Sequence, residues 1–450
     1  MEKKIIRKTK SRCLKCGSIV PAAVIEKEGK VYLEKKCPEH NFTSLLISDN
    51  SDLYRDLENF YFSVMPDNLK SWAREIDLTF RCNMNCPICA CDRKFRAAKA
   101  CFEPTIEEIK YFLEKSKIPV FKLSGGEPTC REDLLEIIRL VKSFKKTIVI
   151  NTNGLKLSDL EYVRNLKQAG VDSINMSFDG FDEKVEKYFR GKNYLPDKIR
   201  ALNNLRQLDI PTGLNITIAK GINETEIPKI IDYAAKNKNI KMLSFGTFSF
   251  MGNARNWDFS CYLMPDQLKN LIVEKTNGKI SQNSIRIFQK LFIGMNSFFF
   301  QKFCLYDSGS TIIFREKGDY TSLDRHINLK PIEKHLDKYA LIFKYSPILA
   351  RAFLTIVGIF SLREIRSGLL ARELFSRGIS FFNKNSKYLR TKSLIYININ
   401  TICDNYKIDY KIAKNCMYGL VFKSSDNILK LRGTGSEICE KILNSEISEF

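Results

Sequence analysis

The chain has 450 residues, of which 44% are apolar and 28% charged, a composition that leaves room for two or three folded domains. This profile is that of a folded globular protein and excludes a disordered chain. The net charge of +22 favours acidic partners such as nucleic acid, an anionic membrane surface or a phosphate-bearing substrate, although general solubility explains it equally well.

The first ten residues are basic but contain no apolar core, so we expect no secretory leader and predict a cytoplasmic protein. Its fourteen cysteines are then better explained as metal ligands and reduced thiols than as disulfides. No segment reaches the roughly 20 apolar residues of a membrane-spanning helix. A basic, apolar stretch at residues 340–375 fits either an amphipathic helix at a membrane surface or a buried helix.

Residues 1–48 are predicted to form a small β-rich metal module. Cys13 and Cys16 make one knuckle, Cys37 and His40 make a second, and two strand-like runs around Glu28 lie between them. Two such pairs are typical of a tetrahedral site for zinc or a mononuclear iron. An alternative leaves His40 at the surface, with water or another cysteine as the fourth ligand.

After a connector at residues 49–73, residues 74–255 alternate short apolar runs with longer amphipathic ones. Strands are predicted at residues 75–79, 120–123, 147–151, 173–177, 213–218 and 241–245. Capping-box spacings begin at Thr105, Thr129 and Ser158, and Gly170 stands where a helix should end. The pattern predicts an α/β fold, a partial (β/α)6 TIM-like barrel. Residues 256–450 are expected to form an α+β domain, substrate-closing or accessory, with strand-like runs at 310–315 and 394–399.

Three cysteines, Cys82, Cys86 and Cys89, follow the first predicted barrel strand on one loop. Iron–sulfur cubanes normally take four cysteines, so three leave one iron open for a small molecule. With Ile88 at a usually aromatic position, this loop resembles the signature of the radical S-adenosylmethionine (SAM) superfamily. Further matches follow at successive strand ends: Gly125, Gly126, Glu127, Asn153, Ser177, Asp179 and Arg190.

The resemblance implies a [4Fe–4S] cluster on the three cysteines and SAM chelated by the open iron. It implies one-electron cleavage of SAM to a 5′-deoxyadenosyl radical, with the electron supplied by a ferredoxin or flavodoxin. The glycines and Glu127 would surround the SAM amino group, and the later residues would contact its ribose and carboxylate. No catalytic residue is assigned beyond the cluster.

The order of modules resembles one radical SAM group, that of tetraether and membrane-spanning lipid synthases and of proteins linked to pterin-dimethyltransferase-like chemistry. This favours hydrogen abstraction from an apolar or lipid-like substrate, with carbon–carbon bond formation or carbon-unit transfer. The alternative is a soluble pterin-like or peptide substrate. A metal-binding nucleic-acid or scaffold protein is disfavoured, because no recognition module is evident.

The remaining cysteines are less informative. Cys91, Cys101 and Cys130 fit buried small apolar residues. An auxiliary cluster would need several of the others to converge in space, and the sequence leaves this open: Cys261, Cys304, Cys403, Cys416 and Cys439.

Overall fold

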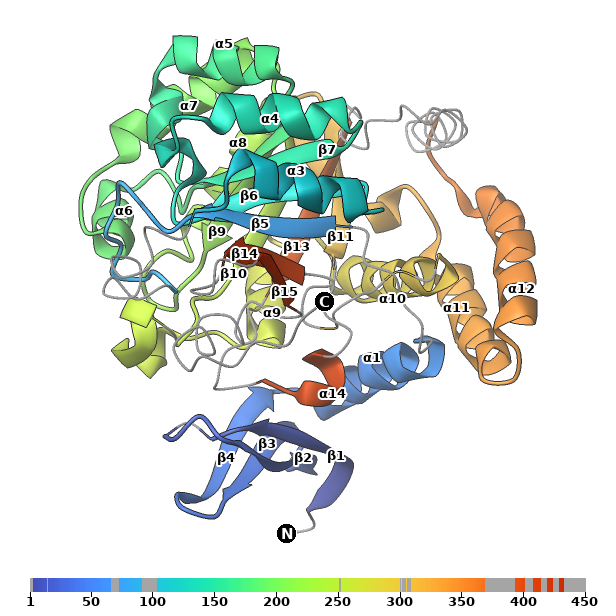
Figure 1. Ribbon diagram of the computed structural model, residues 1–450. Helices are drawn as coiled ribbons and strands as arrows, with labels where there is room; N and C mark the ends of the chain where they lie inside the picture. Colours follow the sequence, from blue (N-terminus) through green and yellow to red (C-terminus); the bar gives the residue numbers. More distant parts are fainter. Residues whose placement is uncertain are drawn as a thin grey trace.

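The computed structural model describes residues 3–13, 15–65, 73–90, 103–250, 252–299, 301, 305, 309–368, 393–400, 408–413, 419–423 and 429–432. A small four-stranded sheet at the N-terminus stands apart from an eleven-stranded sheet with helices on both sides (Figure 1). Several positions considered above lie outside the described residues, namely the end of the 340–375 stretch, Cys91, Cys101, Cys304, Cys403, Cys416 and Cys439.

The small sheet is antiparallel, with its strands side by side in chain order. They are β1 (Lys4–Arg12), β2 (Ile19–Lys27), β3 (Lys30–Cys37) and β4 (Asn41–Ser48). Glu28 and Gly29 have φ of 54° and 71°, so the tight turn lies between the two runs that the sequence predicted. Only a few apolar side chains are buried together in this sheet, so a metal would add stability that its own core does not supply.

The large sheet has the order β12-β11-β13-β10-β9-β8-β7-β6-β5-β14-β15. Its centre is six parallel strands: β5 (Ala73–Thr79), β6 (Val120–Gly125), β7 (Thr147–Thr152), β8 (Ser173–Ser177), β9 (Thr212–Thr217) and β10 (Ile240–Gly246). All six predicted strands are confirmed, and with them the partial-barrel fold class. Later strands extend both edges: β11 (Gly309–Glu316), β12 (Asp319–Ser322), β13 (Leu394–Asn400), β14 (Gly419–Lys423) and β15 (Leu429–Arg432).

Helices that connect the parallel strands cover one face of this sheet (Figure 1). They are α3 (Ile106–Lys115), α4 (Leu134–Ser143), α5 (Leu160–Ala169), α6 (Glu183–Arg190), α7 (Leu195–Gln207) and α8 (Glu226–Lys236), with short 3-10 turns η1 (Pro128–Cys130) and η2 (Leu155–Ser158). In α4 one apolar face, made by Leu134, Ile137, Ile138 and Val141, is almost fully buried. The largest apolar core lies between these helices and the sheet.

Two of the three predicted capping boxes are wrong. Thr105 forms its box with Glu108, as predicted. The Thr129 hydroxyl instead donates to Glu127, and α4 starts later, after Asp133. Ser158 donates to the Leu155 carbonyl, while the neighbouring Asp159 caps α5. In both cases the hydroxyl donates to a nearby oxygen instead of accepting from a helix N–H, as is common for residues that bond to local backbone and side-chain groups.

A second group of helices follows the parallel strands. It comprises α9 (Pro265–Lys275), α10 (Gln282–Phe298), α11 (Leu329–Phe343), α12 (Pro347–Phe360) and α14 (Tyr410–Ala413), with 3-10 turns η3 (Gly252–Asn256), η4 (Phe259–Cys261), η6 (Leu323–Arg325) and η7 (Ser361–Glu364). Together with α1 (Ser51–Val64), which occupies much of the expected connector, α10 and α11 enclose a second apolar core. Among the described residues, no helix is long and apolar enough to cross a membrane.

A buried ion-pair triad joins three distant parts of the chain. Arg7 of β1 donates to Glu58 of α1 and to Asp409 just before α14, at 2.7 Å in each case. All three residues are less than 9% exposed. Each of these charges depends on the others, because a buried charge without its partner is costly.

We therefore expect Arg7→Met to lower the free energy of unfolding by about 3 kcal/mol, because two buried carboxylates lose their shared cation. Urea denaturation measures the change. Lys3→Met is the matched control, since the pair of Lys3 with Glu34 lies at the surface, where such pairs contribute little. Equal midpoints for both variants would contradict the role of the triad.

Candidate functional site

The three-cysteine loop leaves the end of β5 at the carboxyl edge of the parallel strands. Cys82, Cys86 and Cys89 are each half-buried, the Met84 N–H lies 3.4 Å from Cys82 Sγ, and the Cys89 N–H donates to the Cys86 carbonyl. Three thiols on one partly covered loop are donors of the type that iron–sulfur clusters take. The donor set therefore fits a cubane with one iron left open.

Two glycines at the end of β6 hold this loop by its backbone. The Gly126 N–H donates to the Thr79 carbonyl at 2.7 Å, and the Glu127 N–H donates to the Arg81 carbonyl at 2.8 Å. A Cβ on Gly126 would lie 2.3 Å from the Arg81 carbonyl oxygen, and one on Gly125 would lie 2.2 Å from that of Thr79. Only glycine permits this approach. The pair therefore positions the cysteine loop, a role that the sequence did not indicate.

Glu127 is 1% exposed, and its carboxylate is fully engaged by neighbouring loops. Oε1 accepts from the N–H and hydroxyl of Thr129 and from the Thr152 hydroxyl. Oε2 accepts from the Asn153 N–H at 2.7 Å. Burial raises the pKa of Glu127, and these four donors act in the opposite direction. The carboxylate thus connects the ends of β6 and β7.

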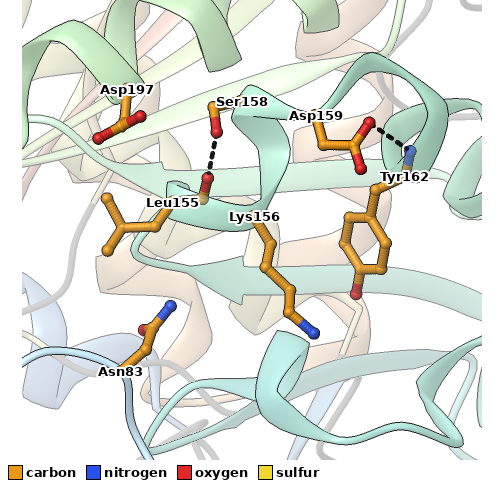
Figure 2. A pocket seen from close by; sticks show the side chains of 7 residues that line it. All are labelled: Asn83, Leu155, Lys156, Ser158, Asp159, Tyr162 and Asp197. Carbon is orange, nitrogen blue, oxygen red and sulfur yellow. Dashed lines mark hydrogen bonds between the residues drawn. The ribbon is translucent and has the colours of Figure 1, made fainter.

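The Asn153 side chain carries this connection on to the cysteine loop, because its amide donates to Asn83 Oδ1 at 2.7 Å. A hollow of about 520 Å³ opens beside this contact. Figure 2 shows Asn83 on one side of it, with Lys156 and Tyr162 from the segment after β7 on the other. Two aspartates, Leu155 and Ser158 complete a lining that is about equally polar and apolar.

A second ionic group reaches the loop from β8 and α6. Asp179 is fully buried, accepts from Arg190 Nε at 2.8 Å and from the Thr217 N–H at 2.9 Å, and so fixes the guanidinium. Burial raises the pKa of the Cys86 thiol, whereas Arg190, which contacts it, acts to lower that pKa. Behind them lies a fully buried pair, Lys198 and Glu186. Ser177, also expected at this site, is half-buried at the end of β8.

Ile88 is 7% exposed and packs among aromatic rings that include Phe189, Phe248 and Tyr262. Cys261 lies at the edge of the same cluster.

Asn253 was missed by the sequence analysis. Its N–H donates to the Cys89 carbonyl at 3.0 Å, and its amide donates to the Cys86 carbonyl at 2.9 Å. The signal that could have found it is a Gly-Asn pair soon after the last parallel strand, where barrel sites are built.

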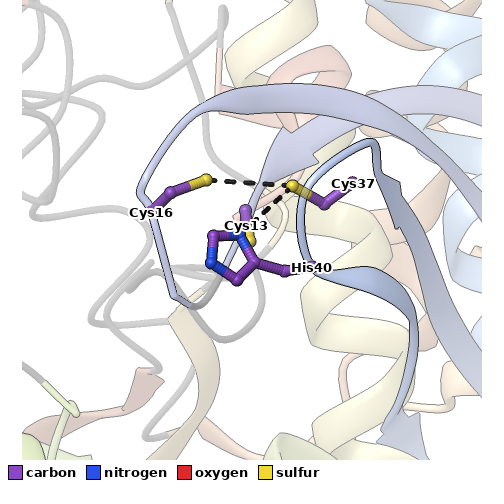
Figure 3. A group of neighbouring side chains, drawn as sticks. All are labelled: Cys13, Cys16, Cys37 and His40. Atoms are coloured by element: carbon purple, nitrogen blue, oxygen red, sulfur yellow. Dashed lines mark hydrogen bonds between the residues drawn. The ribbon is translucent and has the colours of Figure 1, made fainter.

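The four residues of the predicted N-terminal site come together. One potential ligand atom from each of Cys13, Cys16, Cys37 and His40 lies within 4.8 Å of the others (Figure 3). Cys37 Sγ is 3.8 Å from Cys16 Sγ and 3.6 Å from His40 Nδ1. Ligands on a tetrahedral ion with bonds near 2.3 Å are separated by about 3.7 Å, so the group fits such an ion. A hydrogen bond with Ser18 lowers the pKa of Cys16 to about 6.

Comparison with known proteins supports both sites. Residues 76–234 match the family model of the Radical SAM superfamily, and residues 5–49 match that of the HMPTM N-terminal zinc ribbon domain. A 7,8-dihydro-6-hydroxymethylpterin dimethyltransferase of Methanocaldococcus jannaschii is 31% identical over 306 residues, covering 61% of this chain and 60% of the relative.

Probable GTP 3′,8-cyclases are also similar. That of Pyrococcus abyssi is 34% identical over 37% of this chain and 54% of its own length. That of Pyrococcus horikoshii is 31% identical over 48% of this chain and 69% of its own length. The chain thus spans a little over half the length of the first two curated relatives. Membership of the radical SAM superfamily implies a [4Fe–4S] cluster and SAM as cofactors. The zinc ribbon and its four grouped side chains imply a second metal at the N-terminus. This chain belongs to the radical SAM superfamily and carries an N-terminal zinc ribbon.

Proposed function

We propose that this protein is a radical SAM enzyme that modifies a soluble, pterin-like heterocycle. The observation that carries the radical chemistry is the three-thiol loop, held by the Gly126 and Glu127 N–H groups with Arg190 against Cys86. The substrate class is supported by the relatives, one named for a hydroxymethylpterin and others for GTP.

In this proposal Cys82, Cys86 and Cys89 hold the cluster. When bound, the cluster supplies the electron that cleaves SAM to the 5′-deoxyadenosyl radical. Arg190 offers positive charge beside Cys86, which suits an anionic cluster or the SAM carboxylate, and Asp179 keeps the guanidinium in place. Asn153, held by Glu127 and Asn83, stands where it can contact the ribose. A ferredoxin or flavodoxin would deliver the electron.

The other parts of the chain have supporting roles in the proposal. Residues 1–48 form the metal ribbon, with Cys13, Cys16, Cys37 and His40 as the ligands of zinc or a mononuclear iron. Residues 74–255 form the radical SAM barrel, joined to the ribbon by residues 49–73. Residues 256–450 close or support the substrate site, since specificity in barrels comes from such added segments.

A lipid-like substrate is the second candidate. It rests on α12, which exposes Ile348, Leu349 and Ile356 at 77%, 64% and 54% next to a basic stretch of chain. Such a face suits a membrane surface. The similar proteins given above are named for a hydroxymethylpterin and for GTP, so this candidate is second.

An anaerobic assay tests the choice. The reconstituted protein receives SAM and dithionite with either 6-hydroxymethyl-7,8-dihydropterin or a lipid extract, and 5′-deoxyadenosine and modified products are measured by mass spectrometry. We expect deoxyadenosine to rise with the pterin and a mass-shifted pterin to appear. Cys86→Ala is the control that should give neither. Stimulation by lipid alone would replace the proposal with the second candidate.

Gly126→Ala tests how the loop is held. Its Cβ would collide with the Phe80 and Arg81 carbonyl oxygens, so we expect the cysteine loop to shift and deoxyadenosine formation to fall by about tenfold or more. The matched control is Gly358→Ala, where a Cβ meets no atom within 4 Å. Full activity in the Gly126 variant would show that the close approach is dispensable.

Cys13→Ser tests the ribbon. Because four ligands share one ion, we expect the variant to lose about one equivalent of metal per chain by elemental analysis and to unfold at a lower temperature. The iron bound at Cys82, Cys86 and Cys89 should remain. Unchanged metal content would remove the ribbon site, and loss of all iron would mean that the two sites are not independent.

A further inference from the structure

The two faces of the parallel sheet have opposite chemistry. Successive residues of a strand point to opposite faces. On one face of β5–β10, apolar side chains such as Ile76, Leu123 and Ile174 are buried in the main core beneath the helices. The alternate positions carry polar side chains at two levels. Asp77, Ser124, Asn151 and Asn175 lie at the first, and Asn215, Ser244 and Asn398 of the adjoining β13 lie two residues nearer the carboxyl ends, because Asn175 stands opposite Gly213 and Asn215 opposite Ser177.

Strand register sets these residues beside one another. Asp77 stands opposite Ser124, Asn151 opposite Asn175, and Ser244 lies between Asn215 and Asn398. The Asn175 amide donates to Asn151 Oδ1 at 3.1 Å, which confirms that the two side chains share a face. We call these seven residues the polar row.

An apolar cluster lies further down the same face. Nearer the amino ends of the strands, Ala73, Val120 and Val149 are buried together, and on β5 and β6 Glu75 and Lys122 stand between this cluster and the level of Asp77 and Ser124. The carboxyl ends of the same strands carry the cysteine loop and its glycine anchor. The row therefore lies between an apolar base and the reacting end of the barrel.

Asp77 is the residue of the row that needs a ligand. It is 9% exposed, and within the described ranges no cation or hydrogen-bond donor contacts its carboxyl group. Its neighbour Glu75 stands opposite Lys122, whereas Asp77 stands opposite the uncharged Ser124. Burial, and then the charge of Glu75, raise the pKa of Asp77 well above its usual value. A buried carboxyl group without a partner is costly, so a ligand with N–H donors would relieve that cost.

We propose that the polar row binds the 2-amino-4-oxopyrimidine edge of a fused heterocycle, with Asp77 accepting from its adjacent ring N–H and amino group. The inference rests on the proposed function and names the residues that select the substrate. A carboxylate accepts two parallel N–H donors, and asparagine amides pair with ring nitrogens and carbonyls. A hydrocarbon chain would leave the same amides unpaired. Pterins and guanine nucleotides share this edge, so both are sources of the ligand.

Binding to the full-length, reconstituted protein in the presence of SAM tests the inference. The probes are 6-hydroxymethylpterin, GTP and 6-hydroxymethyllumazine, which has an oxo group in place of the 2-amino group. We expect the wild type to prefer one of the two amino compounds to the lumazine. Asp77→Asn should raise the Kd of that compound by about tenfold or more and reduce the preference, because an amide can donate to the oxo group.

Glu136→Gln, on the exposed side of α4, is the matched control and should bind as the wild type does. Iron content and the urea midpoint report folding. If Asp77→Asn does not fold, Asn215→Ala should still weaken binding of the amino compound, since it removes one amide from the row.

The outcomes separate the inference from the proposed function. An unchanged Kd in both Asp77→Asn and Asn215→Ala would overturn the inference, while pterin-dependent deoxyadenosine formation by the wild type would still support the function. Binding of neither amino compound to the wild type would overturn the inference as well, and absence of pterin-dependent turnover would overturn the function. If the wild type binds GTP more tightly than the pterin, the ligand of the row is a guanine nucleotide.

Discussion

The site depends on the backbone contact between the end of β6 and the start of the cysteine loop. The Gly126 and Glu127 N–H groups donate to carbonyls on either side of Phe80, and this direct pairing is possible only because residues 125 and 126 have no Cβ. The three thiols that follow are on a loop with no regular secondary structure. The pairing of β5 with β6 in the large sheet therefore fixes where these thiols lie.

Buried charges make that position rigid. Glu127 connects the loops after β6 and β7, and Asp179 fixes Arg190 against Cys86. Neither carboxylate is accessible, so each acts through the groups that it holds. Asn253 adds a third attachment, from the far side of the parallel strands, by bonding to two carbonyls of the loop. A loop fixed at several points loses little freedom when a ligand binds, which favours precise chemistry.

The two faces of the sheet present different kinds of side chain. The face beneath the helices supplies most of the apolar core, and the opposite face presents carboxylate, hydroxyl and amide groups around Asp77. Apolar residues at the latter positions would add burial, so the polar side chains there are a cost to folding that a polar ligand would offset. The proposed heterocyclic substrate would pair with these groups.

The sequence by itself determined the local features. Periodicity located all six parallel strands, and the spacing of Cys13, Cys16, Cys37 and His40 identified a group that the fold brings together. Tertiary structure decided what depends on contacts between distant segments. In the fold the Gly126 N–H donates to the Thr79 carbonyl, and the Thr129 hydroxyl donates to Glu127 and does not cap a helix. Asn253, distant in the chain, contacts the cysteine loop. Hydrogen-bond partners far apart in the chain leave no periodic signal, so only the folded backbone could choose among them.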